Sequence, residues 1–116
     1  MKIIIAGSRN FKDFDLLEDK CDFYIGTGKA VCIVSGTARG ADQLGERYAD
    51  KSGYIIERHP ANWSKHGKRA GYIRNEEMAK TADCLIAFWD GKSRGTKHMI
   101  DIARREGLRI RVVRFK

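Results

Sequence analysis

Short runs of apolar, mostly β-branched residues alternate along the chain with longer segments in which apolar residues recur every three or four positions. The runs are apolar without interruption, as in Ile3-Ile4-Ile5 and Cys84–Phe88, which is typical of strands covered on both faces. Five strands are predicted, over Lys2–Ala6, Val31–Ser35, Tyr54–Arg58, Asp83–Trp89 and Arg109–Phe115. Arg109, Arg111 and Arg114 give the last strand one polar face, which predicts a place at the edge of the sheet.

The segments between these strands have the spacing of amphipathic helices. In the first segment Phe14, Leu17 and Cys21 recur at helical intervals, and glycines follow or end several segments, as at helix C-termini. The predicted helices are Asp13–Thr27, Gly40–Lys51, Gly67–Thr81 and Thr96–Glu106. Strict alternation of strand and helix implies a parallel sheet with right-handed crossovers. We therefore predict a doubly wound, Rossmann-like, five-stranded parallel sheet in three α/β/α layers, forming one domain over residues 1–116.

Length and composition narrow the class of protein. A chain of 116 residues with 42% hydrophobic and 33% charged residues is an ordinary globular domain. No apolar run approaches the roughly 20 residues of a membrane span, and the N-terminal run is too short for a signal peptide, so we expect a cytoplasmic protein without membrane contact. The three cysteines lack metal-binding spacing, and we expect reduced core thiols and neither a metal nor a cofactor.

The net charge of +8 is unevenly distributed. Residues 10–22 hold five carboxylates and two lysines, whereas residues 92–116 hold nine Lys or Arg and two acids. Such a surplus can attract phosphate groups, from those of a nucleotide to those of a nucleic acid. It is equally compatible with a solvated surface, and charge alone does not separate the two.

In a doubly wound sheet, ligands bind beyond the carboxyl ends of the strands, where the strand order reverses. The first strand ends in Gly7-Ser8-Arg9, which offers a flexible turn, a hydroxyl and a guanidinium, or simply a tight turn. The second ends in Ser35–Asp42, where glycines and a hydroxyl precede a helix start, as in phosphate sites. The stretch is neither a Walker A loop nor a dinucleotide fingerprint, and we expect Asp42 to cap or complement the helix start.

The fourth strand also ends in a loop before a helix, Trp89–Thr96. Gly95-Thr96 repeats the phosphate-binding pattern, and Lys92 and Arg94 add positive charge. Asp90 suits a ribose hydroxyl or a general base, and equally a turn before glycine. The segment His59–Arg74 mixes Trp63, Tyr72 and cations, which suits base stacking beside phosphate, or a surface loop with a half-buried tyrosine.

At these loops the sequence resembles the SLOG superfamily, which groups DNA-processing Smf/DprA Rossmann domains with Lonely Guy phosphoribohydrolases. It resembles in particular the small YspA-like branch, common in bacterial and phage genomes. The resemblance rests on Ile4–Arg9, Val34–Asp42, Arg74–Met78, Ala82-Asp83 and Gly95-Thr96. It implies a nucleotide or nucleotide-derived ligand held by the Gly95-Thr96 loop and the Gly7-Ser8-Arg9 turn, and a possible homodimer.

The chain departs from the Lonely Guy pattern at the carboxylate used for glycosidic cleavage. Those enzymes carry Gly-Gly-x-Gly-Thr-x-x-Glu together with a preceding arginine, which Arg74 matches. The glycine pair is absent and Met99 stands where the glutamate is expected, and a thioether can neither accept a proton nor stabilise an oxocarbenium ion. Asp101 lies about 200° further round the helix and is expected to face away. Hydrolysis would then need Asp90 or Glu76.

Three functions are consistent with the sequence. The first, which we favour, is a module that senses or sequesters a nucleotide-derived ligand, with Trp89 or Trp63 stacking on the base. The second is a nucleotide N-glycosidase or phosphoribohydrolase using Arg74 and Asp90. The third is single-stranded DNA binding. The candidate ligand-binding residues are Gly7, Ser8, Arg9, Gly36, Thr37, Arg39, Gly40, Asp42, Arg74, Asn75, Trp89, Asp90, Ser93, Arg94, Gly95 and Thr96.

Overall fold

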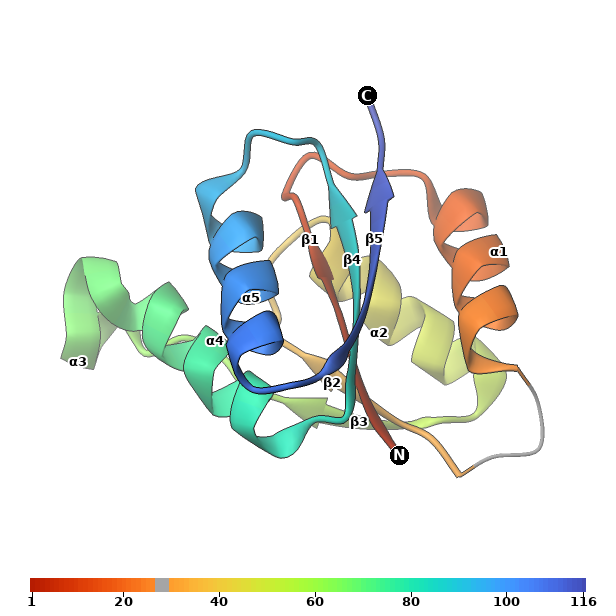
Figure 1. Ribbon diagram of the computed structural model, residues 1–116, viewed down its shortest axis with the longest axis horizontal. Coiled ribbons are helices and arrows are strands. Elements are labelled where there is room, and N and C mark those ends of the chain that lie inside the picture. The colour runs from red at the N-terminus through yellow and green to blue at the C-terminus, as the bar shows by residue number, and fades with distance from the viewer. Residues whose placement is uncertain (27–29) are drawn as a thin grey trace.

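The computed structural model describes residues 1–26 and 30–116, and its centre is a five-stranded sheet (Figure 1). The strands are β1 (Lys2–Gly7), β2 (Cys32–Ser35), β3 (Ile55–Arg58), β4 (Cys84–Trp89) and β5 (Arg109–Arg114). Their order is β3-β2-β1-β4-β5, and all four neighbouring pairs are parallel. The chain therefore winds outward from β1 in one direction to β3, and then returns to β4 on the other side.

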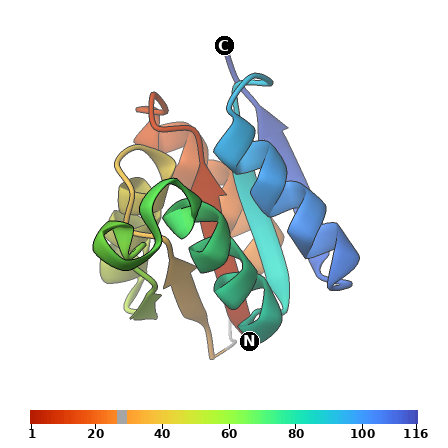
Figure 2. The ribbon, with the colours of Figure 1, turned by 90° about the vertical axis from the view of Figure 1, so that its left-hand side faces the viewer.

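Helices cover both faces of the sheet: Figure 1 shows the strands between two layers of helices, and Figure 2 looks onto the face that α4 and α5 cover. One face carries α1 (Phe14–Ile25) and α2 (Ala41–Ser52), and the other carries α4 (Ala70–Thr81) and α5 (Arg94–Arg105). A short helix, α3 (Trp63–His66), and a 3₁₀ turn, η1 (Gly67–Arg69), lead into α4. The predicted doubly wound, three-layer architecture is confirmed.

The apolar pattern of β1 explains the two cores. Ile3 and Ile5 pack with the residues of α1 and α2, while Ile4 and Ala6 pack with those of α4 and α5. Successive side chains of a strand point to opposite faces, so a strand with helices on both sides must be apolar at every position. β5 occupies one edge and most of its residues are exposed, which confirms its predicted place.

Two helices differ from the predicted bounds by more than one residue at their N-termini. The helix predicted from Gly67 is preceded by α3, whose N-cap Asn62 accepts a hydrogen bond from the amide of Lys65 at 3.1 Å. α5 begins at Arg94, two residues before the predicted start, because Ser93 serves as its N-cap. The predicted end of the first helix at Thr27 lies outside the described residues, and α1 ends at Ile25.

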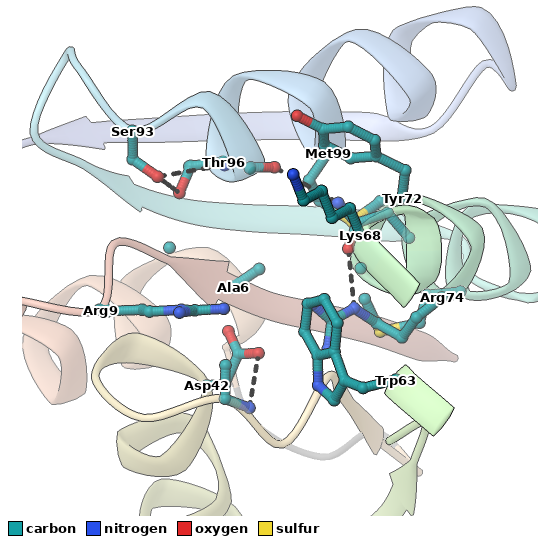
Figure 3. A pocket seen from close by; sticks show the side chains of 16 residues that line it. Ala6, Arg9, Asp42, Trp63, Lys68, Tyr72, Arg74, Ser93, Thr96 and Met99 are labelled. Atoms are coloured by element: carbon teal, nitrogen blue, oxygen red, sulfur yellow. Dashed lines mark hydrogen bonds between the residues drawn. The ribbon is translucent and has the colours of Figure 1, made fainter. Parts of the chain in front are cut away.

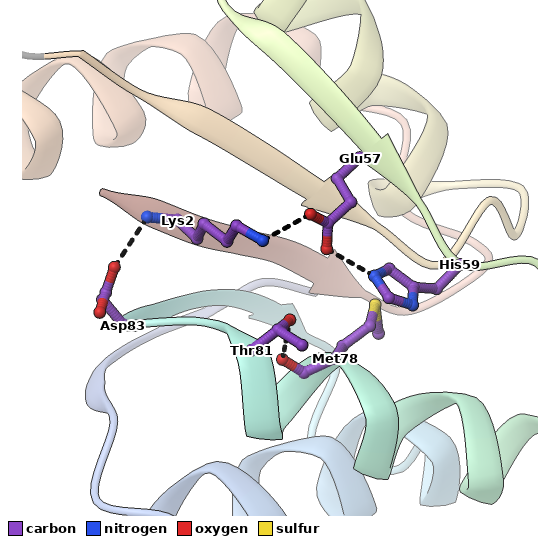
Figure 4. A network of polar contacts seen from close by, with 6 residues as sticks. All are labelled: Lys2, Glu57, His59, Met78, Thr81 and Asp83. Atoms are coloured by element: carbon purple, nitrogen blue, oxygen red, sulfur yellow. Dashed lines mark hydrogen bonds and ion pairs between the residues drawn. The ribbon is translucent and has the colours of Figure 1, made fainter.

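A polar network centred on Lys2 joins β1 to β3 and to Asp83, the residue before β4 (Figure 4). The Lys2 amide donates to Asp83 at 2.8 Å, and the Lys2 ammonium pairs with Glu57 of β3 at 2.6 Å. Since β2 lies between β1 and β3, this side chain spans a neighbouring strand. Glu57 also meets His59 at 2.7 Å, and its two partners hold the pKa of the Glu57 carboxyl below its ordinary value.

No helix in the described part of the chain has the length and apolarity needed to cross a membrane. Of the cysteines, Cys21 is buried in the core, where burial raises the pKa of its thiol to about 12. Cys32 and Cys84 are half-buried.

Candidate functional site

The carboxyl ends of β1, β2 and β4 surround a pocket of about 230 Å³ (Figure 3). It lies at the point where the strand order reverses, between β1 and β4. Two further pockets adjoin it, one of about 330 Å³ beside the loop after β2 and one of about 650 Å³ beside the loops after β1 and β4. The first pocket is lined by Ala6, Gly7, Arg9, Ala38, Asp42, Trp63, Lys68, Gly71, Tyr72, Arg74, Asn75, Met78, Ser93, Gly95, Thr96 and Met99.

The turn after β1 is held rigidly and presents one arginine. Gly7 has no room for a side chain, because an added Cβ would fall on the carbonyl oxygen of Phe88. Ser8 is 1% exposed, and its hydroxyl accepts a hydrogen bond from the amide of Asp90 at 3.2 Å. Arg9 lines all three pockets, and in Figure 3 it reaches between the start of α5 and Asp42. Arg9 is therefore the shared cation of the site.

Three side chains from different elements hold successive residues of the loop after β2. The Arg74 guanidinium of α4 donates to the carbonyl of Gly36. The Ser35 hydroxyl accepts from the amide of Thr37 at 3.1 Å, and Asp42 accepts from the amide of Ala38 at 3.2 Å. Thr37 adopts a φ of 66°, a left-handed conformation that non-glycine residues rarely adopt and that often marks functional loops.

Asp42 is the buried carboxyl of the pocket, with 5% exposure. Burial raises the pKa of its carboxyl to about 6, although Arg74 and the hydrogen bonds from backbone amides oppose the shift. We expected this residue at the helix start, and it lies in the first turn of α2. The N-cap, Gly40, has no side-chain cap, and the Asp42 carboxylate bonds to the preceding loop.

Arg74 and Asn75 connect this loop to the start of α5. The Arg74 Nε donates to the Asn75 side-chain oxygen at 3.0 Å, and the Asn75 Nδ2 donates to the carbonyl of Gly95 at 3.3 Å. Asn75 is 6% exposed, and burial lowers the pKa of the Arg74 guanidinium. The resemblance to the Lonely Guy enzymes implied a functional role for Arg74, and the structure places Arg74 in the pocket wall.

Asp90 forms the turn between β4 and α5. One of its carboxylate oxygens accepts hydrogen bonds from the amides of Lys92 and Ser93, both at 2.8 Å, and these bonds lower the pKa of the Asp90 carboxyl. Ser93 in turn caps α5 by accepting from the amide of Thr96 at 3.4 Å. An added Cβ on Gly95 would meet no atom within 4 Å, so the first turn of α5 is open to the pocket.

Aromatic and sulfur-containing side chains form the remaining wall. Trp63 is 52% exposed and lines two of the pockets, and Tyr72 and Lys68 line the first pocket beside it. Met99 lies buried in the floor of the pocket, at the position where the Lonely Guy pattern has a glutamate. The mixture of aromatics and cations in segment 59–74 indicated Trp63 and Tyr72, whereas Met99 was considered only as the replacement of a glutamate and not as part of the pocket lining.

The structure brings most of the predicted ligand-binding residues to these pockets, but not all of them. Trp89 does not line any of the three, because its indole N–H donates to the carbonyl of Ser93 at 3.1 Å and the Arg114 guanidinium lies 5.3 Å from its ring centre. Arg94 is exposed and is also absent from the lining, and so is Gly40, the N-cap of α2. Of the two tryptophans considered for base stacking, only Trp63 lies in the pocket wall.

The carboxylates considered as substitutes for the missing glutamate lie elsewhere. Glu76 faces Arg105 of α5 at 3.9 Å, and Asp90 lines the 650 Å³ pocket. Asp101 pairs with Lys97 at 2.8 Å on the outer face of α5, as its helical position predicted. Within residues 1–26 and 30–116, no group of three or more metal-ligating side chains is placed to hold an ion.

The order of strands and the pocket at their switch point define a Rossmann-like α/β protein. The chain belongs to the YspA, cpYpsA-related SLOG family, whose profile matches residues 1–66. The chain is also 37% identical over 117 residues to the Gene 61 protein of Mycobacterium phage D29, an alignment that covers 92% of this chain and 91% of the phage protein. No solved structure matches significantly. The predicted membership of the YspA-like branch is confirmed.

Proposed function

We propose that this protein binds a nucleotide or a nucleotide-derived ligand at the carboxyl edge of its sheet, and acts as a sensor or a sequestering module. The observation that supports this most strongly is the meeting of three pockets at Arg9, between loops from β1, β2 and β4. Membership of the SLOG family agrees with a nucleotide-related ligand.

The electrostatics of the pockets favour a phosphate group. Arg9 and Arg39 line the pockets, and no described carboxylate forms an ion pair with either. The N-termini of α2 and α5 lie at the same edge, and the first amides of a helix have no partner within it. An anion seated beside Arg9 would therefore meet guanidinium groups and the positive ends of two helix dipoles.

The apolar side of the first pocket favours an aromatic base. Trp63 is half-exposed at its wall and Met99 is buried in its floor, so a planar ring can stack on one and pack on the other. Lys68 and Tyr72 add polar groups at the rim. Apolar and aromatic walls combined with convergent polar groups are the usual form of a small-molecule site.

A thermal-shift screen of nucleoside mono-, di- and triphosphates and of cyclic dinucleotides tests this proposal, with product analysis of each hit. We expect at least one compound to raise the melting temperature, and Arg9→Gln to remove the effect. Arg109→Gln is the matched control, because it removes the same charge at the opposite end of the sheet. No shift with any compound, or equal shifts in the Arg9 variant and the wild type, would contradict the proposal.

A second candidate, an enzyme that cleaves the N-glycosidic bond of a nucleotide, is supported by Asp42. This buried carboxyl lines the pocket beside Arg74, and its raised pKa suits proton transfer near neutral pH. Recovery of the bound nucleotide intact would support binding alone. Release of free base that is lost in Asp42→Asn but kept in Asp90→Asn would support the enzyme and assign Asp42 in place of Asp90.

A further inference from the structure

The three pockets that meet at Arg9 differ in chemistry. The 230 Å³ pocket contains Trp63, Tyr72 and Met99, which are apolar or aromatic. The 650 Å³ pocket on the other side of Arg9 is lined only by glycine and by polar or charged residues, among them Asn10 and Lys12. The two pockets share Arg9, Ser93 and Gly95. The 230 Å³ pocket therefore suits a base and the 650 Å³ pocket suits a highly hydrated group. The strip between them, formed by the three shared residues, suits an anion.

The sizes of the pockets also indicate a ligand longer than a mononucleotide. The first pocket is smaller than the roughly 300–1,000 Å³ of typical ligand sites, so a ligand whose base is seated there extends beyond it, and the adjoining 650 Å³ pocket has the room for it. A nucleoside monophosphate with its base beside Trp63 and its phosphate at Arg9 would leave the polar pocket empty. Lys12 and Asn10 are exposed there, and no described carboxylate pairs with Lys12.

We propose that the ligand is a nucleoside diphosphate that carries a second polar group on its terminal phosphate, such as a sugar or another nucleoside. The proposal rests on the proposed function and extends it. The base occupies the pocket of Trp63 and Met99, and the diphosphate crosses the strip at Arg9 in front of the open first turn of α5. The second group enters the polar pocket, where Lys12, Asn10 and Arg39 offer hydrogen-bond donors and Asp90 offers an acceptor.

Gly95 explains why the diphosphate can pass at this point. It is in the first turn of α5, is shared by both pockets, and would have open space around an added Cβ. Its lack of a side chain lets a phosphate approach the backbone amides, and Arg9 covers the same strip from β1. Arg39 lines the polar pocket beside Arg9, so the cations follow the path from one pocket to the other.

Isothermal titration of the full chain with matched pairs of compounds tests the proposal. One pair is AMP and ADP-ribose, a second is GMP and GDP-mannose, and NAD⁺ distinguishes a second nucleoside from a sugar. We expect the longer member of one pair to bind about tenfold tighter or more, the effect of one or two additional hydrogen bonds to charged groups. Lys12→Gln should reduce that advantage about fivefold or more and leave the affinity for the monophosphate unchanged.

The remaining variants separate the failure of this proposal from failure of the proposed function. Trp63→Ala should weaken both members of a pair, and Arg109→Gln, at the far end of the sheet, should weaken neither. Equal binding of both members, or an equal effect of Lys12→Gln on both, would overturn the two-part ligand and leave nucleotide binding standing. If no compound bound, both proposals would fail.

Discussion

Asp42 shows how much a single residue can do in this fold. Its carboxylate holds the amide of Ala38, its negative charge faces Arg74, and it lines the candidate pocket. An added Cβ on Gly36 would come within 2.7 Å of this carboxylate and 2.8 Å of the Arg74 guanidinium, so a side chain at this position would displace one of the two groups. A charged carboxyl is thus kept in a buried place, where desolvation disfavours its ionised form.

Asp42 makes the stability of the protein depend on pH in a specific direction. Its carboxyl has a pKa of about 6 when folded and an ordinary value of 3.8, so the unfolded chain loses this proton first as the pH rises. The free energy of unfolding of the wild type, relative to Asp42→Asn, should therefore fall between pH 4 and pH 6 and stay level above it. We expect a total change of about 2 to 3 kcal/mol.

Urea unfolding of both proteins at pH 4.5, 6 and 8 measures this difference. Asn resembles the protonated carboxyl in shape, so other titrating groups cancel in the comparison. A difference independent of pH would show that Asp42 is ionised in the folded state with an ordinary pKa.

At the scale of elements, the alternation of strands and helices was predictable because burial on two faces makes β1 and β4 apolar throughout. α3 was not predicted, since Trp63–His66 has no buried residue and therefore no apolar period. Its one sequence signal is Asn62, a good N-cap three residues before Lys65. The part of the site that includes Trp63 and Lys68 lies on α3 and η1, so its secondary structure was not predicted even though Trp63 was a stacking candidate. Similarly, the sequence makes Trp89 and Trp63 equal candidates for base stacking, and only contacts made in the fold, with Ser93 and Arg114, keep Trp89 out of the pocket.

The contact between Glu57 and Lys2 gives a prediction for the sheet. Glu57→Gln removes the charge that Lys2 of β1 and His59 both meet, and should lower the stability at pH 7 by up to about 1 kcal/mol. Because the folded pKa of Glu57 is depressed, its contribution is present above the unfolded pKa and is lost as the pH falls through the folded value. The deficit should therefore shrink as the pH falls below the ordinary pKa of a glutamate, about 4.3.

Glu77→Gln is the matched control, because Glu77 is exposed on α4. Thermal unfolding of the two variants at pH 7 and pH 3.5 checks the prediction. An equal loss of stability in both variants would mean that the effect comes from the net charge of the protein and not from the contact across β2.

At the scale of the whole molecule, the surplus of positive charge is not gathered in one place. Part of the basic C-terminal quarter is neutralised locally, as where Lys97 and Arg104 meet Asp101. Arg109 and Arg111 lie along β5, at the edge of the sheet, whereas Arg9 and Arg39 lie at the pockets. The charge of +8 is therefore shared between the candidate site and surfaces remote from it.

This distribution predicts a weak dependence of nucleotide binding on salt. A nucleotide has no condensed counterion atmosphere to release, so its affinity should fall only by about tenfold or less through screening between 50 and 200 mM NaCl. A single DNA strand laid over many cations would lose far more, and titrations with a nucleotide and with an oligothymidine at several salt concentrations compare the two. A steep salt dependence for the oligonucleotide, together with tighter binding than any nucleotide, would favour the DNA-binding alternative.

The loop after β2, held at Gly36, Thr37 and Ala38 by side chains of three elements, has a consequence for the speed of recognition. Its backbone is fixed by these hydrogen bonds when the chain folds, so a ligand that binds here would not wait for this loop to close or to become ordered. Association at this side of the site should then be governed by diffusion and charge, and differences in affinity between compounds should arise in how long each one stays bound.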